Sequence, residues 1–486
     1  AVMANALVVS GQFDAQLAGP VGISFVGLGR ACAAVLRIVL LVGFVLVVAA
    51  TTTAPEISSA LVTLLRPLAR LGVPIADVAM VVSVALRFIP ETAAEFDRIE
   101  MAQRARGARF DQGTLRERLS KWVAVLVPLY NEDPDVVVRM LSALLHQSSP
   151  PAEIHVVDDG STQGAYVAER DWFIRQAALA GIYASWQRTP NEGKRHAQVH
   201  GFRKIRDADL FVTVDSDSML DAEALHEIVQ PFSDPRVMSV AGVILAINNR
   251  ENLLARVTDV IFVGQQLIDR SFMSQLGSVM VNSGGLAAYR CSILAENIDT
   301  YLNESYLGRH VEFSDDSLLT LFALLHGRTV QQPSAFAFAW MPDRWSHHYR
   351  QQERWFRGSF IRGLWRIRFL PVLSWGWWRQ ATGWMQIWLV ISVFVYLLLW
   401  RPLVLGGGVP PTVVLVPLAI GLAQGSRYIS VWRSDTTGPQ RYASLLLSPV
   451  ATLWSALILR PLRVWGMVTS AKMGWNTRQQ VEVTSQ

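Results

Sequence analysis

Four stretches of the chain carry almost no charged residues and approach the length of about 20 residues that a membrane-spanning helix needs. They are residues 38–55, 380–400, 402–426 and 442–459. A weaker apolar stretch, 71–86, carries Asp77, and we expect it to pack against protein or to lie partly in the membrane. The pattern predicts membrane regions at both ends of the chain.

Residues 122–342, between these regions, follow a different pattern. Short apolar runs such as VAVLVPLY, EIHVVDD and DLFVTVDSD end in polar residues and are separated by segments with helical periodicity. This alternation predicts β-α-β units around a buried, mostly parallel sheet, which makes the segment an α/β domain. Because ligands of such sheets bind beyond the carboxyl ends of the strands, the polar residues after each run are candidates for a site.

The composition favours a membrane protein. Hydrophobic residues make up 51% of the 486 residues and charged residues only 17%, which is too apolar for a typical soluble enzyme. The net charge is +5, and the arginines lie beside apolar runs, so anionic lipid or a phosphate-bearing substrate explains the charge better than nucleic acid does. The two cysteines, Cys32 and Cys291, match no disulfide framework and no metal-binding spacing. Residues 1–20 lack the pattern of a cleavable signal peptide.

Polar side chains follow three of the apolar runs, at the predicted strand ends: Tyr130 and Glu132, then Asp158 and Asp159, then Asp215 and Asp217. Side chains alternate along a strand, so two aspartates two positions apart can face one point. Mg²⁺ or Mn²⁺ held by one or two carboxylates and a diphosphate is the natural interpretation. Any one of these motifs alone could equally be a solvated acidic turn, but three at consecutive strand ends favour a site.

Two further motifs bring candidate chemistry. Asp315 and Asp316 open an apolar helix, where either could serve as an N-cap. Beside a metal site, one such carboxylate could instead deprotonate an acceptor hydroxyl. Lys194 and Arg195, in the run NEGKRHAQ, could pair with phosphate or could be ordinary surface cations.

The segment SHHYRQQERWFRGSFIRGLW, residues 346–365, predicts a basic amphipathic helix on a membrane surface. At 100° per residue, one apolar stripe, expected to face lipid, contains Trp345, Tyr349, Phe356, Phe360, Leu364 and Ile367. The opposite side contains Gln351, Arg354, Trp355 and Gly358. One side of the helix is therefore expected to anchor the protein at the membrane, and the other side is expected to face the active site.

Eight motifs together resemble the processive inverting glycosyltransferases, and hyaluronan synthases most of all, with cellulose and chitin synthases as more distant relatives. They are VPLYNED, VVDDGS, NEGKRHAQ, VTVDSD, NSGGLAAYR, ENIDTYLNESYLG, SDD and RQQERW, within residues 123–478. The resemblance implies a GT-A-like nucleotide-sugar transferase domain, embedded between transmembrane and interfacial helices, that adds sugars from a UDP-sugar to a polysaccharide. It also implies that the later helices form a channel for the polymer.

The resemblance also implies residue roles. Tyr130 and Asp158 or Asp159 would hold uracil and ribose, Lys194 would bind the nucleotide, and Glu132 and Asp315 belong to the same substrate site. Asp215 and Asp217 would hold the diphosphate and its Mg²⁺ or Mn²⁺, and Asp316 would be the base. Gln351, Arg354 and Trp355 would cover the diphosphate and frame the acceptor. Trp475, Thr477 and Arg478 resemble the family's gating loop, with Asn476 in place of a glycine.

The chain departs from this family at two places. Ser314 and Ser317 flank the aspartate pair where hyaluronan synthases have glycine and arginine, which leaves open the polymer's identity and transfer of a single sugar to a lipid. Residues 1–120 resemble a fragment of the membrane T-component of energy-coupling-factor transporters, in which Ala105–Gly107 would dock onto ATPase subunits. A transporter fusion with an inactive transferase is the alternative, but only one docking motif is present, so a basic linker helix on the membrane is favoured.

These patterns divide the chain into five parts: the N-terminal membrane region 1–120, the transferase domain 121–345, the interface helix 346–370, the channel region 371–478 and the tail 479–486. UDP-sugars are cytosolic, and arginine-rich flanks at 350–368 and 427–441 fit the positive-inside tendency, so a multi-pass plasma-membrane protein with a cytosolic catalytic domain is predicted. The stretch 442–459 is expected to be interfacial or re-entrant.

Overall fold

The computed structural model describes residues 7–9, 15–18, 21–23, 123–162, 166–429 and 437–472. The first three of these ranges are strands β1 (Leu7–Val9), β2 (Ala15–Ala18) and β3 (Val21–Ile23), which form a small antiparallel sheet in the order β1-β3-β2. The predicted apolar stretches 38–55 and 71–86, the docking motif at 105–107 and the gating-loop residues Trp475, Thr477 and Arg478 lie outside the described residues.

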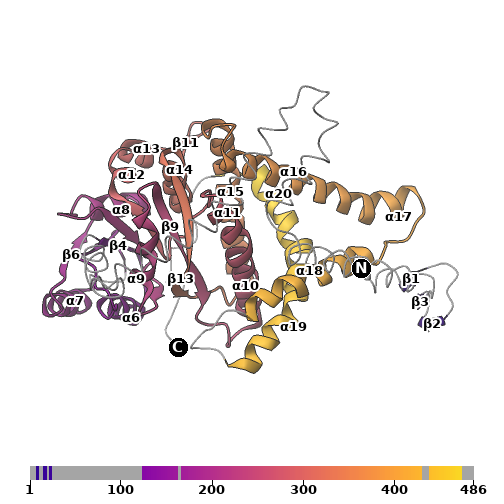
Figure 1. Ribbon diagram of the computed structural model, residues 1–486, viewed down its shortest axis with the longest axis horizontal. Helices are drawn as coiled ribbons and strands as arrows, with labels where there is room; N and C mark the ends of the chain where they lie inside the picture. The colour runs from indigo at the N-terminus through magenta and orange to yellow at the C-terminus, as the bar shows by residue number, and fades with distance from the viewer. Residues whose placement is uncertain are drawn as a thin grey trace, which may run out of the picture. The chain divides into compact units, whose positions relative to one another are not determined.

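An eight-stranded sheet forms the centre of the α/β domain (Figure 1), and its strands follow the order β6-β5-β4-β7-β10-β9-β13-β8. Its strands are β4 (Val123–Leu129), β5 (Glu153–Asp158), β6 (Tyr183–Arg188), β7 (Leu210–Thr213), β8 (Ser218–Leu220), β9 (Val237–Ala246), β10 (Ala287–Arg290) and β13 (Arg328–Ala339). Strands β6, β5, β4 and β7 are parallel neighbours, as are β9 and β13. Strand β10 is antiparallel to its neighbours β7 and β9, and β8 is antiparallel to β13. The predicted α/β fold with a mostly parallel sheet is confirmed.

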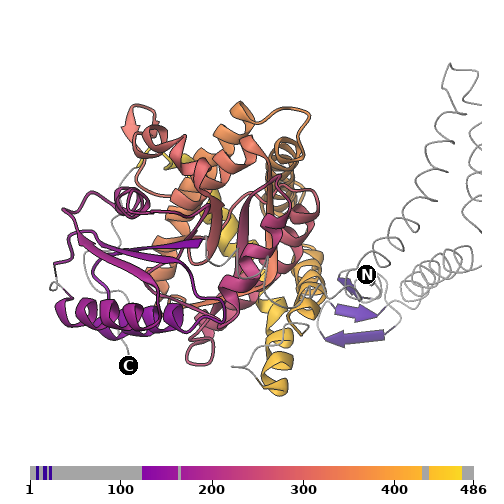
Figure 2. The same ribbon diagram turned by 60° about the vertical axis from the view of Figure 1, so that its left-hand side comes forward.

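Strand β4 shows why the sheet is covered on both faces. All seven of its residues are buried, so the strand has no polar side and reads as a continuous apolar run. Val125 and Val127 pack with helices α6 (Pro134–Leu145) and α7 (Val167–Leu179), whereas Leu126 packs with α8 (Lys194–Phe202) and α14 (Asp315–His326). In Figure 2 the purple helices α6 and α7 lie along one side of the purple strands of this sheet.

The remaining helices of this domain are short or follow β9 and β10. They are α9 (Ala224–Val229), the 3-10 helix η2 (Gln230–Ser233), α10 (Leu253–Gly264), the π-helix η3 (Gln265–Arg270), α11 (Ser271–Gln275), α12 (Cys291–Ala295) and α13 (Ile298–Leu302). The two-residue strands β11 (Ser305–Tyr306) and β12 (Arg309–His310) form a hairpin before α14. This hairpin carries the chain from α13 to the aspartate pair that opens α14.

Long helices follow the sheet. Helix α15 (Trp345–Phe369) is the predicted interface helix, and α16 (Trp375–Val395) continues through the π-turn η4 (Tyr396–Trp400) into α17 (Arg401–Val404). After α18 (Thr412–Ile429), helix α19 (Gly438–Trp454) continues through η5 (Ser455–Leu459) into α20 (Arg460–Val468). By length and composition, the runs Trp375–Val404 and Gly438–Val468 could each cross a membrane.

One predicted boundary is wrong. The apolar stretch 402–426 is not one helix, because α17 ends at Val404 and α18 begins at Thr412. Three glycines and two prolines lie between the two helices, and both residue types favour loops over helix interiors. The stretch 442–459 lies inside the 31-residue helical run Gly438–Val468. Its interfacial or re-entrant placement stays a prediction.

Candidate active site

The carboxyl ends of β4, β5 and β7 meet at one edge of the sheet, as the strand pattern predicts. Asn131 connects the segments after β4 and β5. Its backbone N–H donates to the Ser161 hydroxyl (2.9 Å), and its side-chain oxygen accepts from the Thr162 N–H (2.8 Å). Asn131 has a φ of 50°, a conformation that asparagine tolerates better than most residues. Tyr130, just before it, is half-buried at this edge.

Asp158 and Asp159 lie together at the end of β5 but hold different loops. The carboxylate of Asp158 accepts from the Ser161 N–H (2.9 Å) and lies 3.5 Å from the Arg188 guanidinium. Asp159 accepts from the backbone N–H groups of Glu192 (3.0 Å) and Gly193 (2.8 Å), and burial raises its pKa. Asp159 therefore fixes the loop from which Lys194 and α8 begin.

Glu132 is buried behind the strand ends. Its carboxylate accepts from the Ser216 hydroxyl (2.9 Å), and its backbone N–H donates to the Tyr166 hydroxyl (2.8 Å). Ser216 lies between Asp215 and Asp217 in the sequence. The side chain predicted to bind substrate thus contacts the turn that carries the two aspartates, and its role in substrate binding stays a prediction.

Lys194 is the cation at the centre of the site. Its ammonium group lies 2.7 Å from the carboxylate of Asp215 and 3.1 Å from that of Asp315. Burial alone lowers the pKa of Lys194, but the two carboxylates outweigh burial and raise it above its usual value, so the ammonium stays charged. Asp315 also accepts from the Gln198 amide (3.2 Å), and the result is a charged link between β7 and α14.

A divalent cation fits the residues present at Asp215 and Asp217. Among the described residues, no group of three or more His, Cys, Asp or Glu is arranged to hold a metal. Mg²⁺ needs only one or two protein carboxylates when a diphosphate supplies the other ligands. Gly284 keeps the necessary space open, because a Cβ there would lie 3.2 Å from both the Asp215 carboxylate and the Lys194 ammonium. Both aspartates are half-buried, so a ligand can reach them.

Asp316, the predicted base, is the second residue of α14. Burial, followed by the charge of Asp315, raises the pKa of Asp316 to about 6. The backbone carbonyl of Asp316 accepts from the Thr320 hydroxyl (2.7 Å), and the side chain accepts from the Ser317 N–H (2.6 Å). A carboxylate with this pKa is ionised near neutral pH and still basic enough to take a proton from a hydroxyl group.

The interface helix α15 only partly follows the predicted division into two faces. Trp355 is 37% exposed, and its ring packs edge-on against Phe262 of α10 (centroids 5.6 Å apart); Gln351 and Arg354 are half-buried. Phe356 does not face lipid as predicted, because α20 covers it: the Arg463 guanidinium lies 5.0 Å from the centre of its ring.

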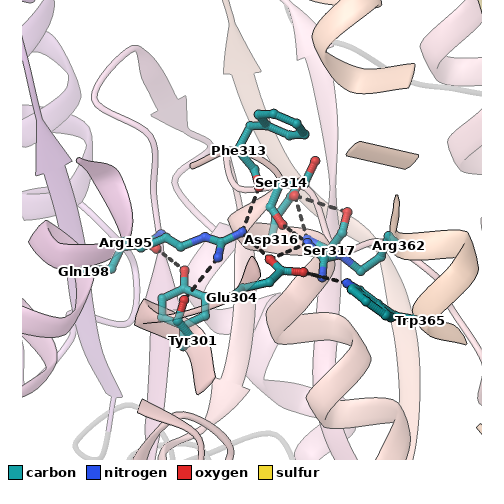
Figure 3. A network of polar contacts seen from close by, with 10 residues as sticks. All are labelled: Arg195, Gln198, Tyr301, Glu304, Phe313, Ser314, Asp316, Ser317, Arg362 and Trp365. Atoms are coloured by element: carbon teal, nitrogen blue, oxygen red, sulfur yellow. Dashed lines mark hydrogen bonds and ion pairs between the residues drawn. The ribbon is translucent and has the colours of Figure 1, made fainter. Parts of the chain in front are cut away.

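A buried ionic cluster, which the sequence did not predict, lies beside the turn that precedes Asp316. Glu304, from the motif NESYLG, accepts from Arg195 of α8 (2.8 Å) and from Arg362 of α15 (3.0 Å), and the indole N–H of Trp365 donates to it as well (2.9 Å) (Figure 3). Arg195, predicted as a phosphate-binding or surface cation, is therefore buried and structural. The sequence offered one signal for this cluster, because NESYLG, which contains Glu304, is part of a motif that resembles the hyaluronan synthases.

Comparisons with known proteins identify the family of the chain. Residues 120–358 match the family model for "Glycosyltransferase like family 2". The hyaluronan synthase of Streptococcus pyogenes is 30% identical over 364 residues, which are 74% of this chain and 84% of that protein. The chain belongs to the family 2 glycosyltransferases. An N-acetylglucosaminyltransferase of Neorhizobium galegae is 32% identical over 252 residues, 51% of this chain and 57% of that protein.

As a family 2 glycosyltransferase, the protein is a hexosyltransferase that takes a nucleotide-sugar donor and a glycan acceptor. The predicted GT-A-like domain is confirmed. Residues 2–132 match the "Cobalt transport protein" model, which confirms the resemblance of the front of the chain to a transporter T-component and indicates a membrane protein.

One solved structure similar to this glycosyltransferase is a mannosyltransferase of Pyrobaculum calidifontis in complex with GDP-Man and Mn²⁺. It has a TM-score of 0.42 and 18% identity, and the match covers 76% of this chain and 97% of that one. A second is TarS of S. aureus, with a TM-score of 0.35 and 15% identity over 72% of this chain and 89% of that one. At that similarity, no residue role is transferred.

Proposed function

We propose that this glycosyltransferase takes its sugar from a UDP-sugar, extends a polysaccharide of the hyaluronan type and passes the polymer out through its C-terminal helices. The observation that carries the proposal is that the Lys194 ammonium contacts two carboxylates at once. One is Asp215, assigned to the donor, and the other is Asp315, assigned to the acceptor side of the site. Asp316 is the next residue along α14. Donor binding and proton removal are thereby assigned to adjoining parts of one site.

The donor is proposed to bind at the strand ends. Tyr130 and Asp158 or Asp159 would hold uracil and ribose, with the diphosphate between Lys194 and Asp215. Asp215 and Asp217 would hold Mg²⁺ or Mn²⁺, and the bound ion would neutralise charge on the leaving diphosphate. Loss of Lys194 would then weaken donor binding, because among the described residues Lys194 supplies the cation at ion-pair distance from Asp215.

The transfer step is a single displacement. Asp316 takes the proton from the acceptor hydroxyl, the hydroxyl oxygen forms a bond to the anomeric carbon, and the bond from that carbon to the diphosphate oxygen breaks. The anomeric configuration is inverted, because one displacement occurs and no carboxylate acts as a covalent nucleophile. Gln351, Arg354 and Trp355 of α15 would cover the diphosphate and frame the acceptor end.

The membrane arrangement follows from the donor. A UDP-sugar is supplied in the cytosol, so the catalytic domain would lie on the cytosolic side of the plasma membrane. The most apolar 18 residues of the run Trp375–Val404 are not buried against protein. This exposure supports contact of the run with a bilayer. Arg368, exposed in the last turn of α15, lies just before that run, as expected for a cytosolic flank.

One experiment tests this proposal. Purified full-length protein would be given each common UDP-sugar with Mg²⁺ or Mn²⁺, and UDP release and product length would be measured. We expect UDP release with one or two sugars and long products. Absence of UDP release with every sugar would refute the UDP-sugar proposal, and release with single-sugar products on lipid would refute the extension of a polymer.

A further inference from the structure

Glu304 joins three separate parts of the protein in one buried cluster. It is 8% exposed, and its two arginine partners, Arg195 and Arg362, are 3% and 0% exposed. Arg195 comes from α8, directly after Lys194, and Arg362 comes from the interface helix α15. Because buried charges are costly unless they are paired, two buried arginines around one carboxylate hold α8 and α15 in a fixed relation.

The same two arginines also hold the turn before the base. Arg195 donates to the backbone carbonyl of Phe313 (2.8 Å), and Arg362 donates to that of Ser314 (3.4 Å) (Figure 3). Ser314 immediately precedes α14 and has a φ of 60°, which a non-glycine residue adopts only at a cost. The surrounding contacts must therefore maintain this conformation, and the arginines supply part of them.

A second contact connects the interface helix to this turn. Gly358 of α15 is buried directly against Ser314, and a Cβ at Gly358 would overlap the Ser314 hydroxyl and lie 2.9 Å from the Ser314 Cβ. Only glycine permits the helix to approach the turn so closely. Gly358 is one turn along α15 from Arg354, so the helix that carries the predicted acceptor frame also touches the turn that places the base.

We propose that Glu304 and Gly358 are positioning residues for the transfer step, which lock the Phe313–Ser314 turn against α15 so that Asp316 faces the acceptor held by that helix. The proposal rests on the proposed function of Asp316 as the base. Neither residue touches the donor in this scheme. Donor binding at Lys194 depends on Asp215 and Asp315, which contact the ammonium directly.

The test uses a pair of substitutions that compensate each other. In the full-length protein, Gly358→Ala pushes a methyl group into Ser314, and Ser314→Gly removes the overlapping atoms and relieves the positive φ. We expect Gly358→Ala to lower kcat about 100-fold, because a misplacement of about 1 Å is that costly. The UDP dissociation constant should stay unchanged, and the double variant Gly358→Ala/Ser314→Gly should recover most of the lost kcat.

Gly363→Ala is the matched control. It makes the same change on the same helix, but its Cβ would meet Trp384 of α16, 2.7 Å away, rather than the turn. Ser314→Gly should not restore any activity lost in Gly363→Ala. Glu304→Gln should behave like Gly358→Ala, with reduced kcat and retained UDP binding; thermal unfolding would identify a variant that fails to fold.

Two results would overturn the proposal. Full kcat in Gly358→Ala would show that the contact does not place the base, and equal loss of kcat and UDP binding without rescue by Ser314→Gly would show that the cluster is merely structural. Failure of the proposed function is a separate outcome, because the unsubstituted protein would then release no UDP from any UDP-sugar.

Discussion

The ammonium group of Lys194 lies 2.7 Å from the carboxylate of Asp215, at the point where α8 begins and β7 has ended. The same ammonium reaches Asp315, the first residue of α14. One cation therefore separates two carboxylates that would otherwise repel each other across the site. The diphosphate of a donor would enter this arrangement as a further anion, and in the proposed function Lys194 is the cation that would balance its charge.

Lys194→Ala is expected to weaken UDP binding by about ten- to a hundredfold, the effect of losing one charge-assisted hydrogen bond. The loss leaves Asp215 and Asp315 without their shared cation, so the site becomes more negative. Isothermal titration calorimetry with UDP and Mg²⁺ would measure the change. Lys204→Ala is the control, because Lys204 is exposed just after α8. Equal UDP affinity in both variants would contradict the assignment.

Asp316→Asn is expected to reduce kcat by about a thousandfold, within the usual contribution of a general base. UDP binding should remain nearly intact, because the proposed donor contacts lie on the strand ends and Lys194. The measurements are UDP release under saturating donor and direct UDP binding. If both fell together, Asp316 would be a nucleotide ligand or a structural residue instead.

The pH dependence of transfer should report the same base. The proposed base is the carboxylate form of Asp316. Burial, together with the charge of Asp315, raises its pKa to about 6, so this form would be lost as the pH falls through that value. We expect kcat/KM to fall about tenfold per pH unit below about 6 and to level off above it. A flat profile down to pH 5 would mean that another group accepts the proton.

Asp217→Asn is expected to raise the concentration of Mg²⁺ or Mn²⁺ that gives half-maximal activity, because an amide binds a hard cation less strongly than a carboxylate does. Activity at saturating metal should partly recover. The titration of activity with each metal would check this, with Asp221→Asn as a control on a neighbouring acidic residue. An unchanged metal requirement would remove Asp217 from the proposed ligand set.

Arg354→Ala is expected to abolish transfer without releasing the protein from the membrane. Arg354 lies on the interface helix next to Trp355, whereas attachment to lipid depends on the exposed apolar runs such as Trp375–Val404. Flotation of vesicles would measure attachment, and UDP release would measure transfer. Arg350→Ala, on an exposed position of the same helix, should retain activity. Activity in Arg354→Ala would exclude the residue from the site.

Local patterns were sufficient to predict the sheet, the edge at which the site lies and the helix that Asp315 opens. Strand β4 is buried on both faces, so its apolar run needed no partner to be recognised, and carboxylates after parallel strands must gather at one edge. The same reasoning predicted α15 as a helix from residue spacing alone. These features depend on neighbours a few positions apart.

The sequence by itself therefore determined the fold class and the family, and it supplied the candidate residues for the donor and the acceptor. The tertiary structure decided which faces are covered and which charges are paired. A helical wheel shows that Phe356 and Gly358 lie on particular sides of α15, but not that α20 covers the first and Ser314 meets the second. Likewise, Glu304 and Arg195 are 109 positions apart, and only the packing of α15 beside α14 makes one carboxylate the partner of two arginines. Such pairings depend on which elements meet in space, which no local periodicity encodes.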